Sequence, residues 1–132
     1  SHMRFSDVRT SAWYAEAVET AVSYELIQGF EDGTFKPASR ITREQAMTIL
    51  ARAMELTGMN TSIEASIVDV SLTAFNDRGE ISSWARTAAA LSSKNGIVNG
   101  YQNNVKPRDF LTRAETAVIM QKLLQRSGLI ND

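Results

Sequence analysis

An internal repeat constrains this chain more than any other feature of its sequence. A shift of 70 or 71 residues lays the first half of the chain on the second half. Both copies run in the same order from Phe-x-Asp and a tryptophan, through a Gly-aromatic pair and Lys-Pro, to Thr-Arg. The offset falls from 71 to 70 because the loop 31–35 has one residue more than the loop 102–105. The sequence therefore predicts two copies of one structural unit.

The first helix of each copy is indicated by apolar residues at spacings of three and four after the tryptophan. Ser11 and Ser83 stand where a side chain caps a helix N-terminus, and we expect them to start these helices. In the second copy, Gly96 supplies a residue that ends a helix in the left-handed conformation.

The second helix of each copy has a stronger start signal. Residues 42–45 and 112–115 read Thr-Arg-Glu-Gln and Thr-Arg-Ala-Glu, which are capping boxes. Apolar stripes follow both boxes and stop before Gly58 and Gly128. Each repeat is therefore expected to be helix, loop, helix.

The fold class that follows is mostly α, with two tandem helix-loop-helix repeats packed in a shared helical bundle. One helical pair cannot cover its own apolar faces, so the repeats must pack on each other. We place the repeats at 4–58 and 74–132, and a polar connector with at most a short turn of helix at 59–73. Residues 1–3, Ser-His-Met, are typical of a cloning scar.

Composition excludes several classes of function. The 14 basic and 15 acidic side chains nearly balance, which argues against nucleic acid as a partner. No cysteine occurs, and the one histidine, His2, lies in the scar, so thiolate, imidazole and sulfur-ligated zinc chemistry are not expected. No apolar run approaches the length of about 18 residues needed for membrane insertion. Nothing places two carboxylates across a cleft, so we expect no enzyme, no metal and no cofactor.

The most informative polar residues are Arg43 and Arg113, each directly after the capping threonine of a second helix. A cation at a helix N-terminus is unfavourable by about 0.3–1 kcal/mol, and it occurs here twice in register. One interpretation is a receptor for an oxyanion, built from the guanidinium and the free amides of the helix terminus. The other is that both arginines bridge to acids of the fold, such as Asp7, Glu44 or Asp77, and hold the loop in place. Spacing leaves both interpretations open.

Three further pairs occupy equivalent positions in the two copies: Trp13 and Trp84, Gly29 and Gly100, and Asp7 and Asp77. A tryptophan at the start of an amphipathic helix is usually a core anchor, but an exposed one offers a platform for a sugar ring. The glycines indicate either a turn with positive φ or a close approach of a ligand to the backbone. The aspartates indicate either caps or acceptors for ligand hydroxyl groups.

With these residues in place, the chain resembles the S-layer homology domain family. The likeness rests on Phe-Ser-Asp-Val at 5–8, the loop 29–37, Ile-Thr-Arg-Glu-Gln at 41–45, and Thr-Arg-Ala-Glu at 112–115. The resemblance implies a module that attaches bacterial surface proteins non-covalently to the cell wall, at the extracellular surface. The implied partner is a secondary cell wall polysaccharide, commonly one that carries pyruvate ketals.

By the same resemblance, the two arginines pair with the ketal carboxylate and the other residues shape the grooves. The expected ligand-binding residues are Arg43, Arg113, Thr42, Thr112, Trp13, Trp84, Gly29, Gly100, Asp7 and Asp77. Family members usually group three repeats around a pseudo-threefold axis, whereas this sequence holds two, so either a third repeat precedes Arg4 or two copies complete a homo-oligomer. Gln45 replaces the capping acid of the first copy, so the two sites need not bind equally. The alternative function is a helical protein-interaction or self-assembly module that binds no glycan.

Overall fold

In the computed structural model, residues 5–59, 61–96 and 102–130 are described. Within these ranges the chain is mostly α-helical, as expected. The helices are α1 (Ala15–Ser23), α2 (Arg43–Leu56), α3 (Ala65–Leu72), α4 (Arg86–Lys94) and α5 (Arg113–Arg126). Two short 3-10 turns, η1 (Arg78–Glu80) and η2 (Ser83–Ala85), precede α4. The strands β1 (Arg40–Thr42) and β2 (Phe110–Thr112), which sequence reasoning did not anticipate, form a two-stranded sheet.

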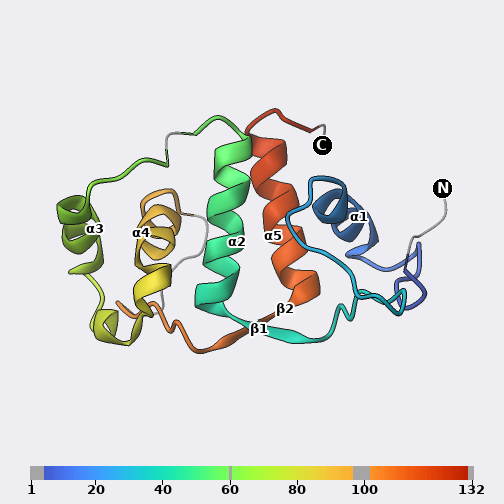
Figure 1. The fold of residues 1–132 in the computed structure, drawn as a ribbon, viewed down its shortest axis with the longest axis horizontal. Helices are drawn as coiled ribbons and strands as arrows, with labels where there is room; N and C mark the ends of the chain where they lie inside the picture. The colour runs from blue at the N-terminus through green and yellow to red at the C-terminus, as the bar shows by residue number, and fades with distance from the viewer. Residues whose placement is uncertain (1–4, 60, 97–101, 131–132) are drawn as a thin grey trace. The chain divides into compact units, whose positions relative to one another are not determined.

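The chain forms two compact units, and each unit takes one part from each repeat. Unit 1 consists of residues 1–41 and 111–132, and unit 2 of residues 42–110. In unit 1, α1 of the first repeat packs on α5 of the second repeat. In unit 2, α4 packs on α3 and on α2, and Figure 1 shows α4 between them. Each unit therefore contains parts of both repeats, because the repeats exchange their second helices.

Both units bury the apolar stripes that the sequence indicates. In unit 1 the buried residues include Phe5, Val8, Ala17, Val18, Ala21, Leu26, Ile27, Phe35, Ala117, Met120, Leu123 and Leu124. In unit 2 they include Ala46, Met47, Leu50, Ala53, Met54, Val68, Leu72, Ile81, Ala85, Ala88, Leu91 and Val105. Each large apolar side chain of this kind contributes about 1.5–3 kcal/mol, so the cores fix the positions of the loops described below.

The ends of the second helices match the sequence signals. Both capping boxes are complete at α2 and α5. The left-handed residues after these helices are Gly58, with φ 80°, and Gly128, with φ 81°. Gly96 takes φ 65° after α4, as expected. These signals act between residues close in sequence, which is why they can be recognised without the fold.

The predicted starts of the first helices are wrong. Neither Ser11 nor Ser83 caps a helix: α1 begins at Ala15 and α4 at Arg86, and neither start has a side-chain cap. Tight backbone turns lie in front of both helices instead. In the first repeat the amides of Ala12 and Ala15 bond to carbonyls three residues earlier, and in the second repeat Ser83 lies inside η2. Because these turns bond amides at the entry to the helix, the chain enters it without a hydroxyl cap.

The connector contains more structure than its polar composition predicts. Helix α3 spans eight residues of it, longer than the short turn expected. Val68 and Leu72 of α3 are buried, and the helix packs on α4. Packing of this apolar side thus stabilises a helix that its local sequence signals only weakly.

Candidate ligand-binding site

The threonines of both capping boxes are engaged in starting helices. The hydroxyl of Thr42 accepts from the amide of Gln45 at 3.2 Å, and that of Thr112 accepts from the amide of Glu115 at 3.0 Å. In return, the side chains of Gln45 and Glu115 accept from the threonine amides at 2.8 and 2.7 Å. The neutral Gln45 therefore replaces the acid without loss of the capping geometry. The role of both threonines in ligand binding stays a prediction.

The helix termini differ from expectation in one respect, because their amides are not free. In unit 1 the amides of Arg113 and Ala114 donate to the carbonyls of Ser39 and Pro37 at 2.9 and 3.0 Å. The third amide of α5 donates to the threonine hydroxyl of the capping box. An anion therefore cannot use the first three amides of the helix, and the guanidinium is the remaining cationic group there.

Unit 2 repeats this arrangement. The amides of Arg43 and Glu44 donate to the carbonyls of Asp109 and Pro107 at 2.7 and 3.1 Å. In both units the acceptors are the proline of the Lys-Pro step in the other repeat and the residue two positions after it. Each second helix packs against the other repeat, and this packing brings the distant carbonyls to the start of the helix. The sequence of a single repeat does not reveal this contact.

Arg113 holds the loop of the first repeat by bonds to neutral carbonyl groups. Its Nε donates to the carbonyl of Phe35 at 2.8 Å, and one terminal nitrogen donates to the carbonyl of Gln28 at 2.6 Å. Burial lowers the pKa of the Arg113 guanidinium from its ordinary value, and the negative charge of Asp7 acts in the opposite direction. Among the described residues Arg113 forms no salt bridge. Arg113 therefore holds the loop, as the second interpretation of the sequence expects, but it does so without the bridge to an acid that this interpretation includes.

Arg43 lies in the equivalent position of unit 2, but it is only 4% exposed. Its Nε donates to the carbonyl of Val105 at 2.9 Å, which matches the bond from Arg113 to Phe35. The neighbouring carboxylate of Glu44 is also buried, and it accepts from the amide and the hydroxyl of Ser82 at 2.8 and 2.7 Å. Glu44 thus ties α2 to the segment before α4, a role that the sequence did not signal.

The two aspartates of the Phe-x-Asp motifs clamp the loops of their own repeats. Both oxygens of Asp7 accept backbone amides, from Phe35 and Lys36, each at 2.8 Å. Asp77 accepts in the same way from the two matching amides of the second loop, at 2.8 and 2.7 Å. The carboxylates therefore hold the loops, and any further bond to a ligand hydroxyl group stays a prediction.

Gly29 is required by close packing and not by a positive φ, so the positive-φ interpretation is wrong for it. A Cβ atom at this position would clash with the edge of the Phe5 ring. The left-handed turn in this loop is made instead by Gly33, with φ 84°. Gly100, its counterpart in the second repeat, lies outside the described residues.

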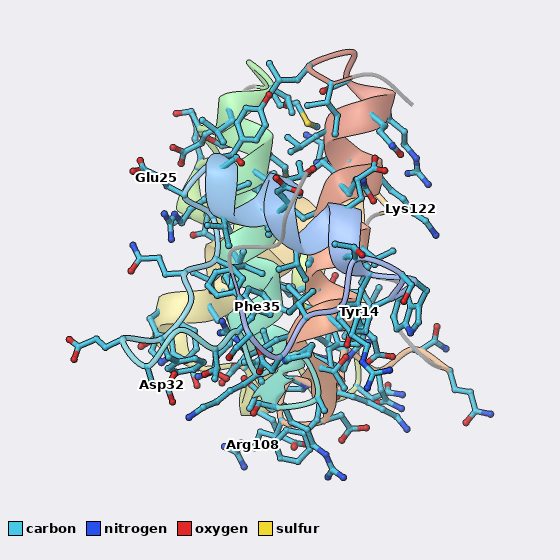
Figure 2. The ribbon with its side chains drawn as sticks, turned by 90° about the vertical axis from the view of Figure 1, so that its right-hand side faces the viewer. Tyr14, Glu25, Asp32, Phe35, Arg108 and Lys122 are labelled. Carbon is cyan, nitrogen blue, oxygen red and sulfur yellow. The ribbon has the colours of Figure 1, made fainter. Side chains whose placement is uncertain are left out.

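Trp13 and Trp84 are exposed, at 69% and 58%, so the interpretation of them as core anchors is wrong. Trp13 makes an edge contact with the ring of Tyr14, with 5.1 Å between the ring centroids. Figure 2 shows Tyr14 at the surface and Phe35 on the inner side of the loop that carries Asp32. Two exposed indoles at equivalent positions remain candidates for sugar platforms.

Sequence reasoning missed two residues beside Arg113, namely Phe30 and Lys36. Phe30 is 42% exposed, and the guanidinium carbon of Arg113 lies 4.9 Å from its ring centroid. The ammonium of Lys36 lies 4.4 Å from the same centroid. Both residues belong to motifs that the repeat displays, Gly-aromatic and Lys-Pro, but only the fold brings them next to an arginine that follows 77 or more residues later.

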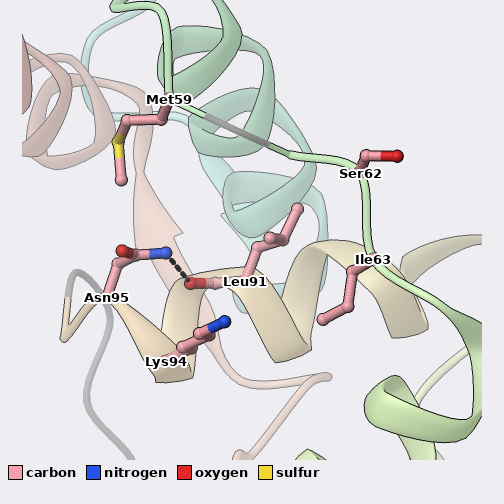
Figure 3. Close-up of a pocket in the computed structure, with 6 residues that line it drawn as sticks. All are labelled: Met59, Ser62, Ile63, Leu91, Lys94 and Asn95. Atoms are coloured by element: carbon pink, nitrogen blue, oxygen red, sulfur yellow. Dashed lines mark hydrogen bonds between the residues drawn. The ribbon is translucent and has the colours of Figure 1, made fainter.

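One hollow outside these loops lies in unit 2, between the connector and α4. It has a volume of about 250 Å³ and is lined by Met59, Ser62, Ile63, Leu91, Lys94 and Asn95. Figure 3 shows the amide of Asn95 bonded to the carbonyl of Leu91 at its edge. None of the predicted ligand-binding residues lines it.

The part of the chain that the structure describes contains no helix that is both apolar and long enough to span a bilayer. The same ranges hold no group of three or more histidine, cysteine or acidic side chains arranged for a metal ion.

Comparison with known proteins agrees with the repeat analysis. A sequence model described as the S-layer homology domain matches residues 4–47 and 74–117. The chain is 43% identical to an amylopullulanase of Thermoanaerobacterium thermosulfurigenes over 96% of its length, and 42% identical to exoglucanase XynX of Acetivibrio thermocellus over 94%. It is 26% identical, over 98% of its length, to a cellulosome-anchoring protein of Acetivibrio thermocellus. The matched region spans only 6%, 11% and 28% of these three proteins, respectively.

Proposed function

The chain belongs to the S-layer homology domain family, and from this premise we propose that it binds a pyruvylated secondary cell wall polysaccharide through Arg113. Modules of this family anchor surface proteins at the bacterial cell wall and are not themselves catalytic. The finer proposal concerns the ligand: an acidic glycan whose ketal carboxylate pairs with the guanidinium. We assign the enzymatic activities named among the relatives to parts of those proteins that this chain does not match.

The proposal rests on the positive charge of Arg113 and on the neutral groups to which its side chain is bonded. Its two side-chain hydrogen bonds go to neutral carbonyls, and among the described residues no acid forms a salt bridge with it. The guanidinium is half-buried, so its charge is less screened than that of a fully exposed side chain. A charge-assisted hydrogen bond to a ligand carboxylate at such a site contributes about 1.5–3 kcal/mol.

The exposed tryptophans support a sugar ligand. An indole that is 69% exposed, as in Trp13, leaves a large apolar surface in contact with water. The edge contact with Tyr14 restrains the ring, which lowers the entropy lost when a sugar ring packs on it. A pyranose ring has the flat C–H face that such a platform accepts.

Calorimetric titration tests the proposal with purified pyruvylated wall polysaccharide. The same polymer after mild acid removal of its ketals is the ligand control. Arg113→Lys keeps the charge but loses the fork that grips the loop carbonyls, and we expect it to weaken binding by about tenfold. Arg126→Ala is the matched protein control, because it removes a cation from the other end of α5, about 20 Å away. Equal affinity for the two polymers, or an Arg126→Ala effect as large as that of Arg113→Lys, would contradict the proposal.

A second candidate function, self-association, is favoured by an apolar surface on α3. Ile67 and Val70 of this helix are 45% and 67% exposed. Light scattering with Val70→Lys decides the matter: a dimer that this change converts to a monomer supports self-association, and a monomeric wild-type chain excludes it.

A further inference from the structure

Helix α4 ends in an asparagine that is followed by a glycine, Asn95-Gly96. Asn95 is the C-cap residue, and both residues are exposed. Asparagine is thermolabile because the backbone nitrogen of the next residue can attack its carboxamide carbon. Glycine places no Cβ atom beside that nitrogen, so it hinders this attack less than any other residue. The sequence therefore puts a chemically reactive pair at a helix end that is open to water.

Hydrogen bonds of the last helical turn hold this pair in place. The carboxamide nitrogen of Asn95 donates to the carbonyl of Leu91 at 2.8 Å, and Figure 3 shows this bond at the end of α4. The backbone amide of Asn95 donates to the same carbonyl at 3.1 Å, and the amide of Gly96 donates to the carbonyl of Ser93 at 3.2 Å. These bonds belong to the terminal turn, the part of a helix that opens most easily.

The backbone of Asn95 does not have the conformation that the attack needs. Because its ψ is 3°, the Gly96 nitrogen eclipses the backbone nitrogen of Asn95 and not its Cβ atom. A succinimide ring closes only when the Gly96 nitrogen rotates to the side of Cα that carries the side chain. This rotation breaks the bond from the Gly96 amide to Ser93. Ring closure therefore has to follow the opening of the last turn of α4.

The first repeat forms the same turn without the reactive pair. Tyr24 and Glu25 occupy the positions of Asn95 and Gly96 by the repeat offset of 71. Tyr24 caps α1 with φ −89° and ψ 6°, against −97° and 3° for Asn95. The amide of Glu25 donates to the carbonyl of Val22, as that of Gly96 does to its own helix. The turn therefore forms without an asparagine, and the reactive pair distinguishes unit 2 from unit 1.

We propose that Asn95 is a site of spontaneous deamidation, and that opening of the last turn of α4 controls its rate. In the open state the Gly96 nitrogen forms a bond to Cγ of Asn95 and gives its proton to a solvent base, and ammonia leaves from Cγ. Water then opens the succinimide ring at one of its carbonyl carbons, which yields aspartate or isoaspartate without oxidation or reduction. The reaction does not involve the proposed glycan site.

The product cannot restore the cap. An aspartate side chain only accepts hydrogen bonds, so it cannot donate to the carbonyl of Leu91 as the carboxamide does. Its negative charge lies at the negative end of the helix dipole, where it is unfavourable. Isoaspartate also adds a methylene group to the main chain. Each modified chain therefore has a less stable end of α4, and refolding does not reverse the change.

Peptide mass spectrometry after timed incubation in mildly alkaline buffer tests the site. All arms carry Asn99→Gln, which leaves Asn95-Gly96 as the remaining Asn-Gly pair of the sequence, and fragmentation assigns the mass gain to residue 95. We expect conversion in the folded chain to be about fivefold to thirtyfold slower than in concentrated urea, the range that opening of a helix end gives. Low urea concentrations that leave the chain folded should change the rate little, because one turn exposes little surface.

Asn95→Gln is the matched chemical control, since it keeps the carboxamide but lengthens the side chain, and no conversion is expected at that position. The proposal is overturned if Asn95 stays unmodified in the folded chain over a period in which the chain in urea converts completely. Equal rates in the two states, or a steep acceleration by low urea concentrations, would overturn control by the last turn.

A melting experiment tests the consequence for the cap. Asn95→Asp reproduces one product and is expected to lower the melting temperature by about 2–6 °C. Asn76→Asp makes the same charge change in an exposed turn outside the α-helices, and it is expected to change the melting temperature by less than about 2 °C. Equal shifts in the two variants would overturn the loss of the cap.

Discussion

Replacement of Ser92 by alanine is expected to stabilise this protein. Ser92 lies on α4 with no exposed surface, and its hydroxyl has no hydrogen-bond partner among the described residues. The repeat offset of 71 places Ala21 of α1 at the equivalent position, and this alanine is also buried. The second repeat therefore holds a buried polar atom where the first repeat has none.

The magnitude follows from three contributions. An unsatisfied buried hydroxyl group costs about 1–3 kcal/mol relative to a bonded one. Alanine is also favoured over serine inside a helix by about 0.5 kcal/mol. Removal of one oxygen atom leaves a small void that takes back part of this gain. The net expectation is that Ser92→Ala raises the free energy of unfolding by about 1–2 kcal/mol.

Urea unfolding followed by circular dichroism measures this difference, and the reverse change Ala21→Ser is the matched control. Ala21→Ser places an extra hydroxyl in a tightly packed site and is expected to lower the free energy of unfolding by a comparable amount. If Ser92→Ala lowers stability, the hydroxyl has a partner and the reasoning is wrong. If Ser92→Ala lowers stability and Ala21→Ser leaves it unchanged, the α4 site favours a hydroxyl group and the α1 site tolerates one, which is the opposite of what we expect.

The remaining predictions concern the loops and the ligand. Asp7→Asn and Asp77→Asn each replace one accepting oxygen by the NH2 group of a carboxamide, which cannot accept a hydrogen bond from a loop amide. Each change is expected to lower the free energy of unfolding by about 1–2 kcal/mol in urea titrations. Unchanged stability would show that these two aspartates are not needed to hold the loops. Glu25 has φ 59° at the position that Gly96 occupies in the second repeat. Glu25→Gly is therefore expected to raise the free energy of unfolding by about 1 kcal/mol, and Gly96→Ala to lower it by about 1 kcal/mol. The melting temperature should rise in the first variant and fall in the second, and the opposite signs would refute the strain argument. An increase from about 50 to about 500 mM salt is expected to weaken glycan binding less than tenfold, and a loss of about a thousandfold would indicate a polyanion site with many contacts.

The exposure of the tryptophans illustrates where sequence patterns mislead. Position at the start of an amphipathic helix predicted burial, yet Trp13 and Trp84 both lie largely in solvent. The burial of a residue beside a helix start depends on which distant part of the chain packs against it. Periodicity within one segment contains no information about such long-range contacts.

The sequence by itself determined the features that arise between near neighbours. The repeat, the capping boxes of α2 and α5, and the left-handed Gly58, Gly96 and Gly128 all depend on residues a few positions apart, so their chemistry can be read along the chain. Only the tertiary structure decided which residues share a site. Because the repeats exchange their second helices, Arg113 grips the loop of the first repeat and Arg43 grips the loop of the second. The burial of apolar surface drives this exchange, and burial is a property of the assembled fold and not of any local segment.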